Sequence, residues 1–257
     1  MSSLHSRFYP ASRPDAVHLV LVHGWGLAGG VWHALLPHLR AVAHLTVIDR
    51  AGYGGSADLS PEHELEALLA VVPARAIYVG WSLGFGLVAE LALRHPQRVQ
   101  ALAAVAVNPC FVERSDWPHA MPEPVFSQFQ QQVALAAEAT LKRFVALQCH
   151  GSASQKQDIR TLNYLLLAEP LPSTEVLERG LQQLAAQDLR PVLAHLTCPL
   201  LWLLGKRDAL VPFAIGADLT ADNMTVVTIP NAAHVPHISH AELTAAHIRA
   251  FIQELQR

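Results

Sequence analysis

The chain has 257 residues, of which 51% are hydrophobic and 15% are charged, and its formal net charge is −3 with histidine neutral. A chain of this length can bury a substantial core, as one large domain or two smaller ones. The small negative charge argues against a nucleic-acid-binding protein, and no stretch reaches the roughly 18 apolar residues of a membrane-spanning helix.

The cysteines and the N-terminal residues bear on the cellular compartment. Cys110, Cys149 and Cys198 are scattered without a CxxC spacing, which predicts neither a metal site nor a disulfide framework. Residues 1–15 have no apolar core of signal-peptide length. We therefore expect a cytoplasmic protein with reduced thiols that needs no metal.

Apolar, β-rich segments alternate with helical patterns along most of the chain. Continuous apolar strands without alternation indicate a sheet that is covered on both faces, and strands that alternate with helices indicate a mostly parallel sheet. The sequence therefore predicts an α/β fold with a central sheet flanked by helices. The predicted strands are 17–22, 44–48, 76–79, 101–107, 199–204 and 225–229, and the predicted helices are 31–42, 61–72, 83–95 and 242–257.

Residues 112–188 interrupt this alternation. They contain prolines at 118, 122 and 124, followed by helical patterns over 127–148 and 158–169, and no convincing strand. We interpret 112–188 as a helical lid insertion between two parts of one core, residues 1–111 and 189–257.

A lone serine stands between glycines where the predicted strand 76–79 gives way to a helix. The stretch Gly80-Trp81-Ser82-Leu83-Gly84 matches the G-x-S-x-G pattern of a nucleophile elbow. Small neighbours are needed because the turn is tight, and the helix N-terminus favours developing negative charge. The alternative is an ordinary strand-to-helix turn with a capping serine.

A serine nucleophile needs a base, and the base needs a group that orients it. In this kind of sheet the chain order is serine, acid, histidine. Asp208 follows the predicted strand 199–204, and His234 follows the predicted strand 225–229, so both are expected at the same sheet edge as Ser82. Asp208 as a turn residue, and His237 or His240 as the base, are the alternatives.

Two backbone N–H groups are expected to form an oxyanion hole. One belongs to Leu83, the residue after the serine, and the other to Trp25 in the glycine-rich turn His23-Gly24-Trp25-Gly26. The same turn could instead cradle a dinucleotide. It lacks a clean G-x-G-x-x-G, and Asp49 after the second strand reads better as part of a loop near the site.

Together these motifs resemble the α/β-hydrolase superfamily over residues 17–108 and 198–257. The stretches "VHLVLVHGWGLAGGVW", "GWSLGFGLVAELALRHPQRVQAL", "NPCF", "RFVALQ" and "AAHVPHISH" further resemble the BioH-type pimeloyl-[acyl-carrier protein] methyl ester esterases. The resemblance implies hydrolysis of a methyl ester on a carrier-bound pimeloyl chain, in biotin synthesis, without a cofactor. It assigns the triad to Ser82, Asp208 and His234. It also implies a substrate site formed by Trp25, Ser82, Leu83, Phe144, Val145, Ala146, Leu147, Gln148 and His234.

The lid carries a local positive charge in a chain that is acidic overall. Between 139 and 168 four cationic residues, Lys142, Arg143, Lys156 and Arg160, stand against Asp158, which gives a net +3, while Glu138 and Glu169 flank the region. Such a surface suits an acidic carrier protein. The alternative is an ordinary solvated helix face.

Two features depart from the family pattern. Phe85 follows the elbow glycine where a small residue is usual, and the segment before Val17 is short, so that the usual leading hairpin is expected to be trimmed. Other functions remain as alternatives, because one fold hosts many chemistries, although an intact triad argues against the last of those that follow. They are a broad-specificity short-chain carboxylesterase acting on small esters, a carbon–carbon bond hydrolase, and a ligand-binding receptor with little turnover. We expect a monomer.

Overall fold

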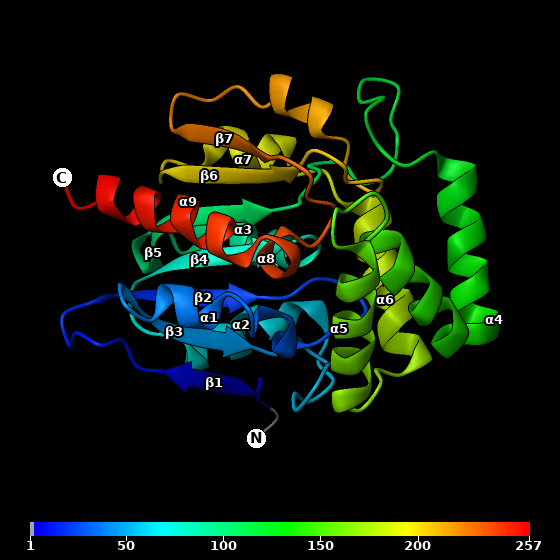
Figure 1. Ribbon diagram of the computed structural model, residues 1–257, viewed down its shortest axis with the longest axis horizontal. Coiled ribbons are helices and arrows are strands. Elements are labelled where there is room, and N and C mark those ends of the chain that lie inside the picture. Colours follow the sequence, from blue (N-terminus) through cyan, green and yellow to red (C-terminus); the bar gives the residue numbers. More distant parts are fainter. Residues whose placement is uncertain (1–2) are drawn as a thin grey trace.

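A seven-stranded sheet forms the centre of the computed structural model, which describes residues 3–257 (Figure 1). The strands lie in the order β1-β3-β2-β4-β5-β6-β7, and all neighbours are parallel except the antiparallel pair β1 and β3. The six predicted strands are confirmed, with ends that shift by at most two residues. The strands are β1 (Ser6–Tyr9), β2 (Val17–Val22), β3 (Ala43–Ile48), β4 (Ala76–Trp81), β5 (Val99–Val105), β6 (Leu200–Gly205) and β7 (Met224–Ile229).

The edge strand β1 was not predicted. It pairs with β3 from Ser6 opposite Ile48 to Tyr9 opposite Leu45. Its four side chains alternate between exposed and half-buried, so the segment lacks the continuous apolar run that marks the inner strands. Because β3 lies between β1 and β2, the two leading strands do not form a hairpin.

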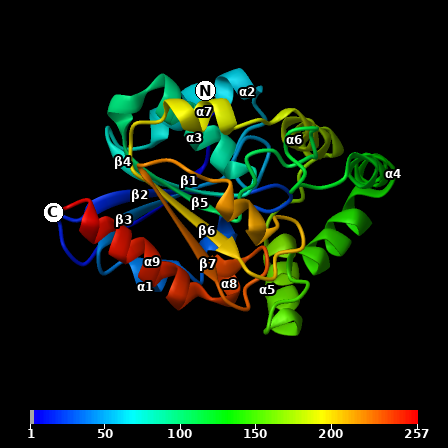
Figure 2. The same ribbon diagram turned by 90° about the horizontal axis from the view of Figure 1, so that it is seen from above.

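Helices cover both faces of the sheet, as the continuous apolar strands predict. On one face lie α1 (Leu36–Leu39), α8 (Pro236–Ser239) and α9 (Ala241–Glu254). On the other lie α2 (Pro61–Val71), α3 (Gly84–Arg94) and α7 (Arg190–His195), as the view from above shows (Figure 2). The sheet is therefore the middle layer of three.

The predicted helix over 31–42 is wrong. The structure has a short 3₁₀ helix at Gly29–Trp32 and the single-turn helix α1. Pro37 lacks an N–H group and is tolerated only in the first turn of a helix, and it stands in the first turn of α1. The apolar periodicity there reflects burial of two short elements.

Three helices between β5 and β6 lie together beyond the carboxyl ends of the strands (Figure 1). They are α4 (Glu123–Gln148), α5 (Gln155–Ala168) and α6 (Thr174–Ala186), called here the insertion helices. α4 bends at Ala136, whose backbone is not helical (φ −155°, ψ 65°). The insertion helices therefore cover the sheet edge at which the predicted catalytic residues lie.

The core contains large aromatic side chains, among them Trp32, Tyr78, Trp81 and Trp202, all fully buried. The three cysteines are free thiols. Among residues 3–257, no helix combines the length and the apolar character needed to cross a bilayer.

Candidate active site

Ser82 occupies a sharp turn between β4 and α3. Its φ is +50°, in the left-handed region that residues with side chains rarely adopt, and its N–H donates to the carbonyl oxygen of Val105 on β5 over 3.0 Å. A Cβ on Gly84 would lie 2.3 Å from the carbonyl oxygen of His23, so a larger residue cannot stand there. This strained turn with a small neighbour is the geometry of a nucleophile elbow.

Phe85, the departure from the family pattern, is a core residue. Its ring is fully buried and packs edge-on against Trp202, with ring centroids 5.0 Å apart. A Cβ on Gly80 would lie 2.4 Å from the Cα of Phe85. The phenyl ring therefore fills the contact between α3 and the sheet.

His234 and Asp208 form a buried pair at the ends of neighbouring strands. Nδ1 of His234 lies 2.8 Å from Oδ2 of Asp208. The other carboxylate oxygen, Oδ1, accepts from the N–H groups of Leu210 and Val211 at 2.8 and 3.0 Å. Because the carboxylate accepts at Nδ1, that nitrogen carries the proton, and Nε2 is left to act as a proton acceptor.

The main chain of His234 is fixed from two sides. Its carbonyl oxygen accepts from Nε1–H of Trp81 at 2.9 Å, and its N–H donates to the carbonyl oxygen of Gln148 at 3.1 Å. Trp81 directly precedes Ser82, and Gln148 is the last residue of α4. The histidine loop is thus tied both to the serine turn and to the insertion helices.

Sequence reasoning named Gln148 but missed Trp81. The two x positions of G-x-S-x-G carry no fixed residue type, and a tryptophan at one of them is taken for an ordinary core residue. Its indole N–H, which must find a partner when buried, was the available signal. The side-chain amide of Gln148 is buried, and neither of its polar atoms has a partner among the described residues.

The structure selects among the three histidines of the stretch 234–240. His234 alone of the three bonds to Asp208 within the described residues, whereas His237 lies in α8 and His240 precedes α9. Over residues 3–257, the Oγ of Ser82 makes no hydrogen bond to the ring of His234. The two groups stand in adjoining turns, and such contacts are often long before substrate binds.

Two backbone N–H groups border the serine. Those of Trp25 and Leu83 donate to no protein acceptor within residues 3–257. A Cβ on Gly24 would lie 3.1 Å from the Cβ of Ser82, so the loop that carries Trp25 passes directly beside the serine. Free N–H groups in this position suit an oxyanion.

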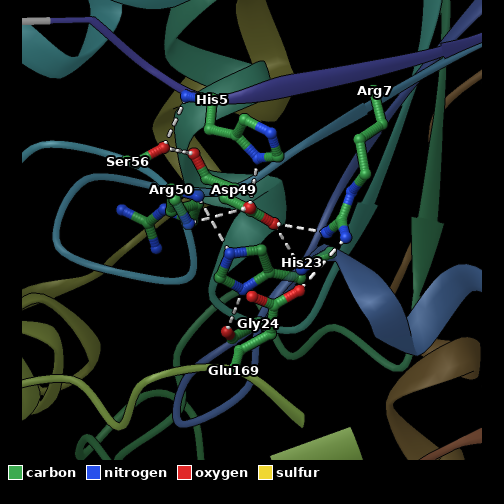
Figure 3. Close-up of polar contacts among 10 residues, drawn as sticks. His5, Arg7, His23, Gly24, Asp49, Arg50, Ser56 and Glu169 are labelled. Carbon is green, nitrogen blue, oxygen red and sulfur yellow. Dashed lines mark hydrogen bonds and ion pairs between the residues drawn. The ribbon is translucent and has the colours of Figure 1, made fainter.

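Asp49 is fully occupied by neighbours in the protein. Its buried carboxylate accepts from the N–H groups of Gly29 and Gly55 at 2.8 and 3.2 Å. It also pairs with Arg7 at 3.0 Å and with the His5 ring at 2.7 Å (Figure 3). These bonds hold the pKa of Asp49 below its usual value although burial alone would raise it. A carboxylate so engaged braces loops and is not available to a nucleotide ribose.

An apolar cavity of about 70 Å³ lies under the insertion helices. The ring of Trp25 reaches it, packs edge-on against Phe129 and Phe144, and donates from Nε1 to the carbonyl oxygen of Leu177 at 2.8 Å. Of the predicted stretch 144–148, Phe144 and Leu147 line this cavity, while Val145, Ala146 and Gln148 do not. The lining residues are Trp25, Phe111, Met121, Val125, Phe129, Phe144, Leu147, Leu181 and Leu184.

The four predicted docking cations are all exposed. Lys142 pairs with Glu138 at 2.7 Å, and Arg143 donates to the hydroxyl of Thr140 at 3.1 Å. The other two, Lys156 and Arg160, stand one turn apart on α5.

Two acidic residues near these cations are buried or paired with another cation. Asp158 is buried and accepts from the hydroxyls of Ser152 and Ser154. Glu169 pairs with Arg7 at 3.1 Å. The positive character of α5 is therefore greater than a residue count indicates.

Comparison with known proteins places these features in a family. A family model described as "Alpha/beta hydrolase family" matches residues 19–247. A pimeloyl-[acyl-carrier protein] methyl ester esterase of Pectobacterium atrosepticum is 41% identical, over 98% of this chain and 100% of the relative. The protein of that name from Serratia marcescens is 44% identical over 91% of this chain and 93% of its own.

A solved structure shares the fold. An esterase from Exiguobacterium antarcticum superposes with a TM-score of 0.84 at 16% identity, covering 98% of this chain and 100% of the other. At that identity the likeness concerns the arrangement of the sheet, its helices and the insertion.

Proposed function

Because this chain belongs to the alpha/beta hydrolase family, we propose that it is a serine carboxylesterase that cleaves the methyl ester of pimeloyl-[acyl-carrier protein], releasing the free acid and methanol. Relatives named for that activity are 41–44% identical over most of their length. The observation that carries the proposal is the buried hydrogen bond between Asp208 and His234, at the sheet edge where Ser82 is held in a strained turn. We place the reaction in biotin synthesis.

In the proposed mechanism His234 takes the proton of Ser82 through Nε2 as the hydroxyl attacks the ester carbonyl. Asp208 keeps the imidazole in the required tautomer and stabilises its cationic form. The N–H groups of Trp25 and Leu83 receive the oxyanion, each contributing about 3 kcal/mol in comparable enzymes. Methanol departs with the proton from His234, and a water molecule activated by the same base then releases the acid.

The acyl chain is proposed to enter from the side of the insertion helices. The cavity lined by Trp25, Phe144 and Leu147 is wholly apolar, and burial of methylene groups there contributes about 0.8 kcal/mol each. Residues 112–188 thus act as the lid, and Phe144 and Leu147 of the stretch 144–148 contact the bound chain. We extend the proposal to Gln148, whose buried amide lacks a protein partner among the described residues.

The carrier protein is proposed to dock on the cations Lys142, Arg143, Lys156 and Arg160. All four are exposed on α4 and α5, and opposite charges on two partners accelerate their encounter. We also propose that the enzyme works as a monomer in the cytoplasm, where a carrier-bound intermediate would reach it. Analytical ultracentrifugation at micromolar concentration tests the oligomeric state.

The test of the proposal is a comparison of substrates with the purified protein. The kcat/KM for the methyl ester of the pimeloyl-carrier conjugate is expected to exceed that for p-nitrophenyl butyrate. Rapid turnover of the small ester with little of the conjugate would instead indicate a broad carboxylesterase. Complementation of a biotin-requiring strain that lacks the methyl esterase, with Ser82→Ala as the negative control, tests the biological role.

Two further results would replace the proposal. Turnover of a vinylogous 1,5-diketone with no turnover of esters would indicate a carbon–carbon bond hydrolase. Binding of the conjugate without turnover, and without labelling of Ser82 by a fluorophosphonate, would indicate a receptor.

A further inference from the structure

His23 is a fully buried histidine at the end of β2, beside the serine turn but outside the triad. Its ring makes two hydrogen bonds to main-chain groups. Nδ1 lies 2.7 Å from the carbonyl oxygen of Gly24, and Nε2 lies 2.9 Å from the backbone nitrogen of Arg50, at the end of the neighbouring strand β3 (Figure 3). The ring thus bridges two loops at the carboxyl edge of the sheet.

These two partners determine the protonation state of the ring. The N–H of Arg50 can only donate, so Nε2 accepts, and the carbonyl of Gly24 can only accept, so Nδ1 carries the proton. Burial lowers the pKa of His23 to about 4, which keeps the ring neutral at physiological pH. A single tautomer therefore holds both bonds.

The partner on the β3 side is itself rigid. The guanidinium of Arg50 forms a buried ion pair with Glu64 at 2.8 Å, and Oε1 of Glu64 also accepts from the N–H of Ala51 at 2.9 Å. Asp49 just before it is held by the contacts described above. His23 is therefore anchored at Nε2 to a segment of main chain that buried polar contacts hold in place.

The other bond fixes the plane of the Gly24–Trp25 peptide. In a trans peptide the carbonyl of one residue and the N–H of the next point in opposite directions. Holding the Gly24 carbonyl toward His23 consequently turns the N–H of Trp25 away from it. A flip of this peptide would reverse both groups.

Position 24 needs such a restraint because it has to be glycine. A Cβ there would lie 3.1 Å from both the Cβ of Ser82 and the carbonyl oxygen of Trp81. Glycine adopts many backbone conformations with little preference, so the residue that permits the close approach also permits the flip.

We propose that His23 is a positioning residue that holds the Gly24–Trp25 peptide with its N–H in the oxyanion hole. This inference rests on the proposed function, in which the Trp25 N–H receives the oxyanion. The donor at Nδ1 is the group that acts on the peptide. The acceptor at Nε2 holds the ring in place.

Two single variants separate these groups. In His23→Asn the amide nitrogen, attached at Cγ as Nδ1 is, can still donate to the Gly24 carbonyl, but the acceptor for Arg50 is lost. In His23→Gln the amide lies one atom further out, where it can accept from the Arg50 N–H, and the donor to Gly24 is lost. Each variant removes one buried hydrogen bond, so similar decreases in melting temperature are expected.

Activity is expected to distinguish the two variants. With p-nitrophenyl butyrate, His23→Gln should lower kcat by about 10²-fold, the effect of losing one oxyanion donor, with KM little changed. His23→Asn should stay within about fivefold of the unmodified enzyme. Phenylboronic acid, which forms an anionic tetrahedral adduct with a reactive serine, should lose affinity in His23→Gln in parallel with kcat.

Equal losses of kcat in the two variants, or an unchanged boronate affinity in His23→Gln, would overturn the inference and leave a purely structural role. Failure of the proposed function would look different, because the unmodified protein would then fail to hydrolyse the carrier-bound methyl ester, whereas the comparison of the two variants uses p-nitrophenyl butyrate. Near-ultraviolet circular dichroism of both variants verifies that the aromatic core is intact.

Discussion

Nε1–H of Trp81 donates to the main-chain carbonyl oxygen of His234 over 2.9 Å, across a sequence separation of 153 residues. Trp81 ends β4 and directly precedes the serine, so this one bond joins the serine turn to the histidine loop. The ring of Trp81 also packs on that of His234, with centroids 5.7 Å apart. The residue before the serine therefore links the turn of Ser82 to the loop of His234.

Replacing Trp81 with phenylalanine is expected to lower kcat about tenfold while KM changes little. The phenyl ring keeps most of the packing but leaves the carbonyl of His234 without its donor, a loss of about 1–3 kcal/mol in stability. Steady-state kinetics on p-nitrophenyl butyrate and thermal unfolding measure the two effects.

Trp202→Phe is the matched control for this variant. Trp202 is equally buried, and its Nε1–H donates to the carbonyl oxygen of Val107 at 3.0 Å, where the bond holds neither functional turn. A similar loss of stability with unaltered kcat is expected. Equal kcat values for the two variants would contradict a role for Trp81 in placing His234.

Ser82→Ala is expected to abolish ester hydrolysis, lowering kcat by roughly 10⁶-fold as in other triad enzymes. The alanine removes the nucleophile, and fluorophosphonate labelling should disappear with turnover. Alanine keeps the Cβ and therefore carries the same strain at φ +50° as Ser82, so the variant should fold with nearly unchanged stability. Substantial turnover by the purified variant would exclude Ser82 as the nucleophile.

Reversing the charge at Arg143 and Arg160 to glutamate is expected to lower kcat/KM for the carrier-bound methyl ester by at least tenfold. Each reversal replaces attraction to an acidic carrier with repulsion. Hydrolysis of p-nitrophenyl butyrate should not change, since both side chains are exposed on the outside of the insertion helices. Raising the salt concentration should weaken the effect of the charge reversal on kcat/KM for the carrier-bound ester, because salt screens the attraction between exposed charges.

Arg75→Glu provides the control for charge. Arg75 is exposed and directly precedes β4, at the end of the sheet opposite to the serine turn. If Arg75→Glu lowers kcat/KM for the carrier-bound ester as much as the reversals on α4 and α5 do, the effect comes from net charge. The proposed docking surface on α4 and α5 is then wrong.

His237→Phe is expected to stabilise the protein at acid pH. His237 is fully buried between Trp32 and Trp81, at 4.7 and 4.8 Å between ring centroids, and neither ring nitrogen has a partner among the described residues. Burial, with smaller contributions from the neighbouring His234 and His33, lowers the pKa of His237 to about 3.

The pH dependence follows from this depressed pKa. The unfolded chain protonates His237 below about pH 6.5, whereas the folded chain does so only near pH 3. The free energy of unfolding therefore falls as the pH drops between these values, by up to about 1.4 kcal/mol per pH unit from this residue. Urea unfolding at pH 7 and pH 5 should show a smaller fall in His237→Phe. The exposed His119→Phe is the control, and a parallel pH dependence in both would contradict the argument.

The sequence by itself determined the layered fold and the identity of the candidate triad. Of the six apolar segments, five are the inner strands, which are apolar at most positions because they are covered on both faces, and the sixth is the edge strand β7. Ser82, Asp208 and His234 each follow such a strand, and parallel strands bring their carboxyl ends to one edge. Each apolar segment, and each residue that follows one, is recognised from a short stretch of sequence, without knowledge of what packs against it.

The tertiary structure alone decided which groups hold these residues in place. The contacts of Trp81 with His234 and of His23 with Arg50 and Gly24 join separate loops, and no spacing in the chain encodes them. The edge strand β1 was not predicted because its side chains alternate between exposed and half-buried, so its sequence has no continuous apolar run. The predicted helix over 31–42 is wrong because Pro37 is tolerated only in the first turn of a helix, and α1 begins at Leu36. Hydrogen bonds need atoms placed to within a few tenths of an ångström, and only the packing of the whole chain supplies that precision.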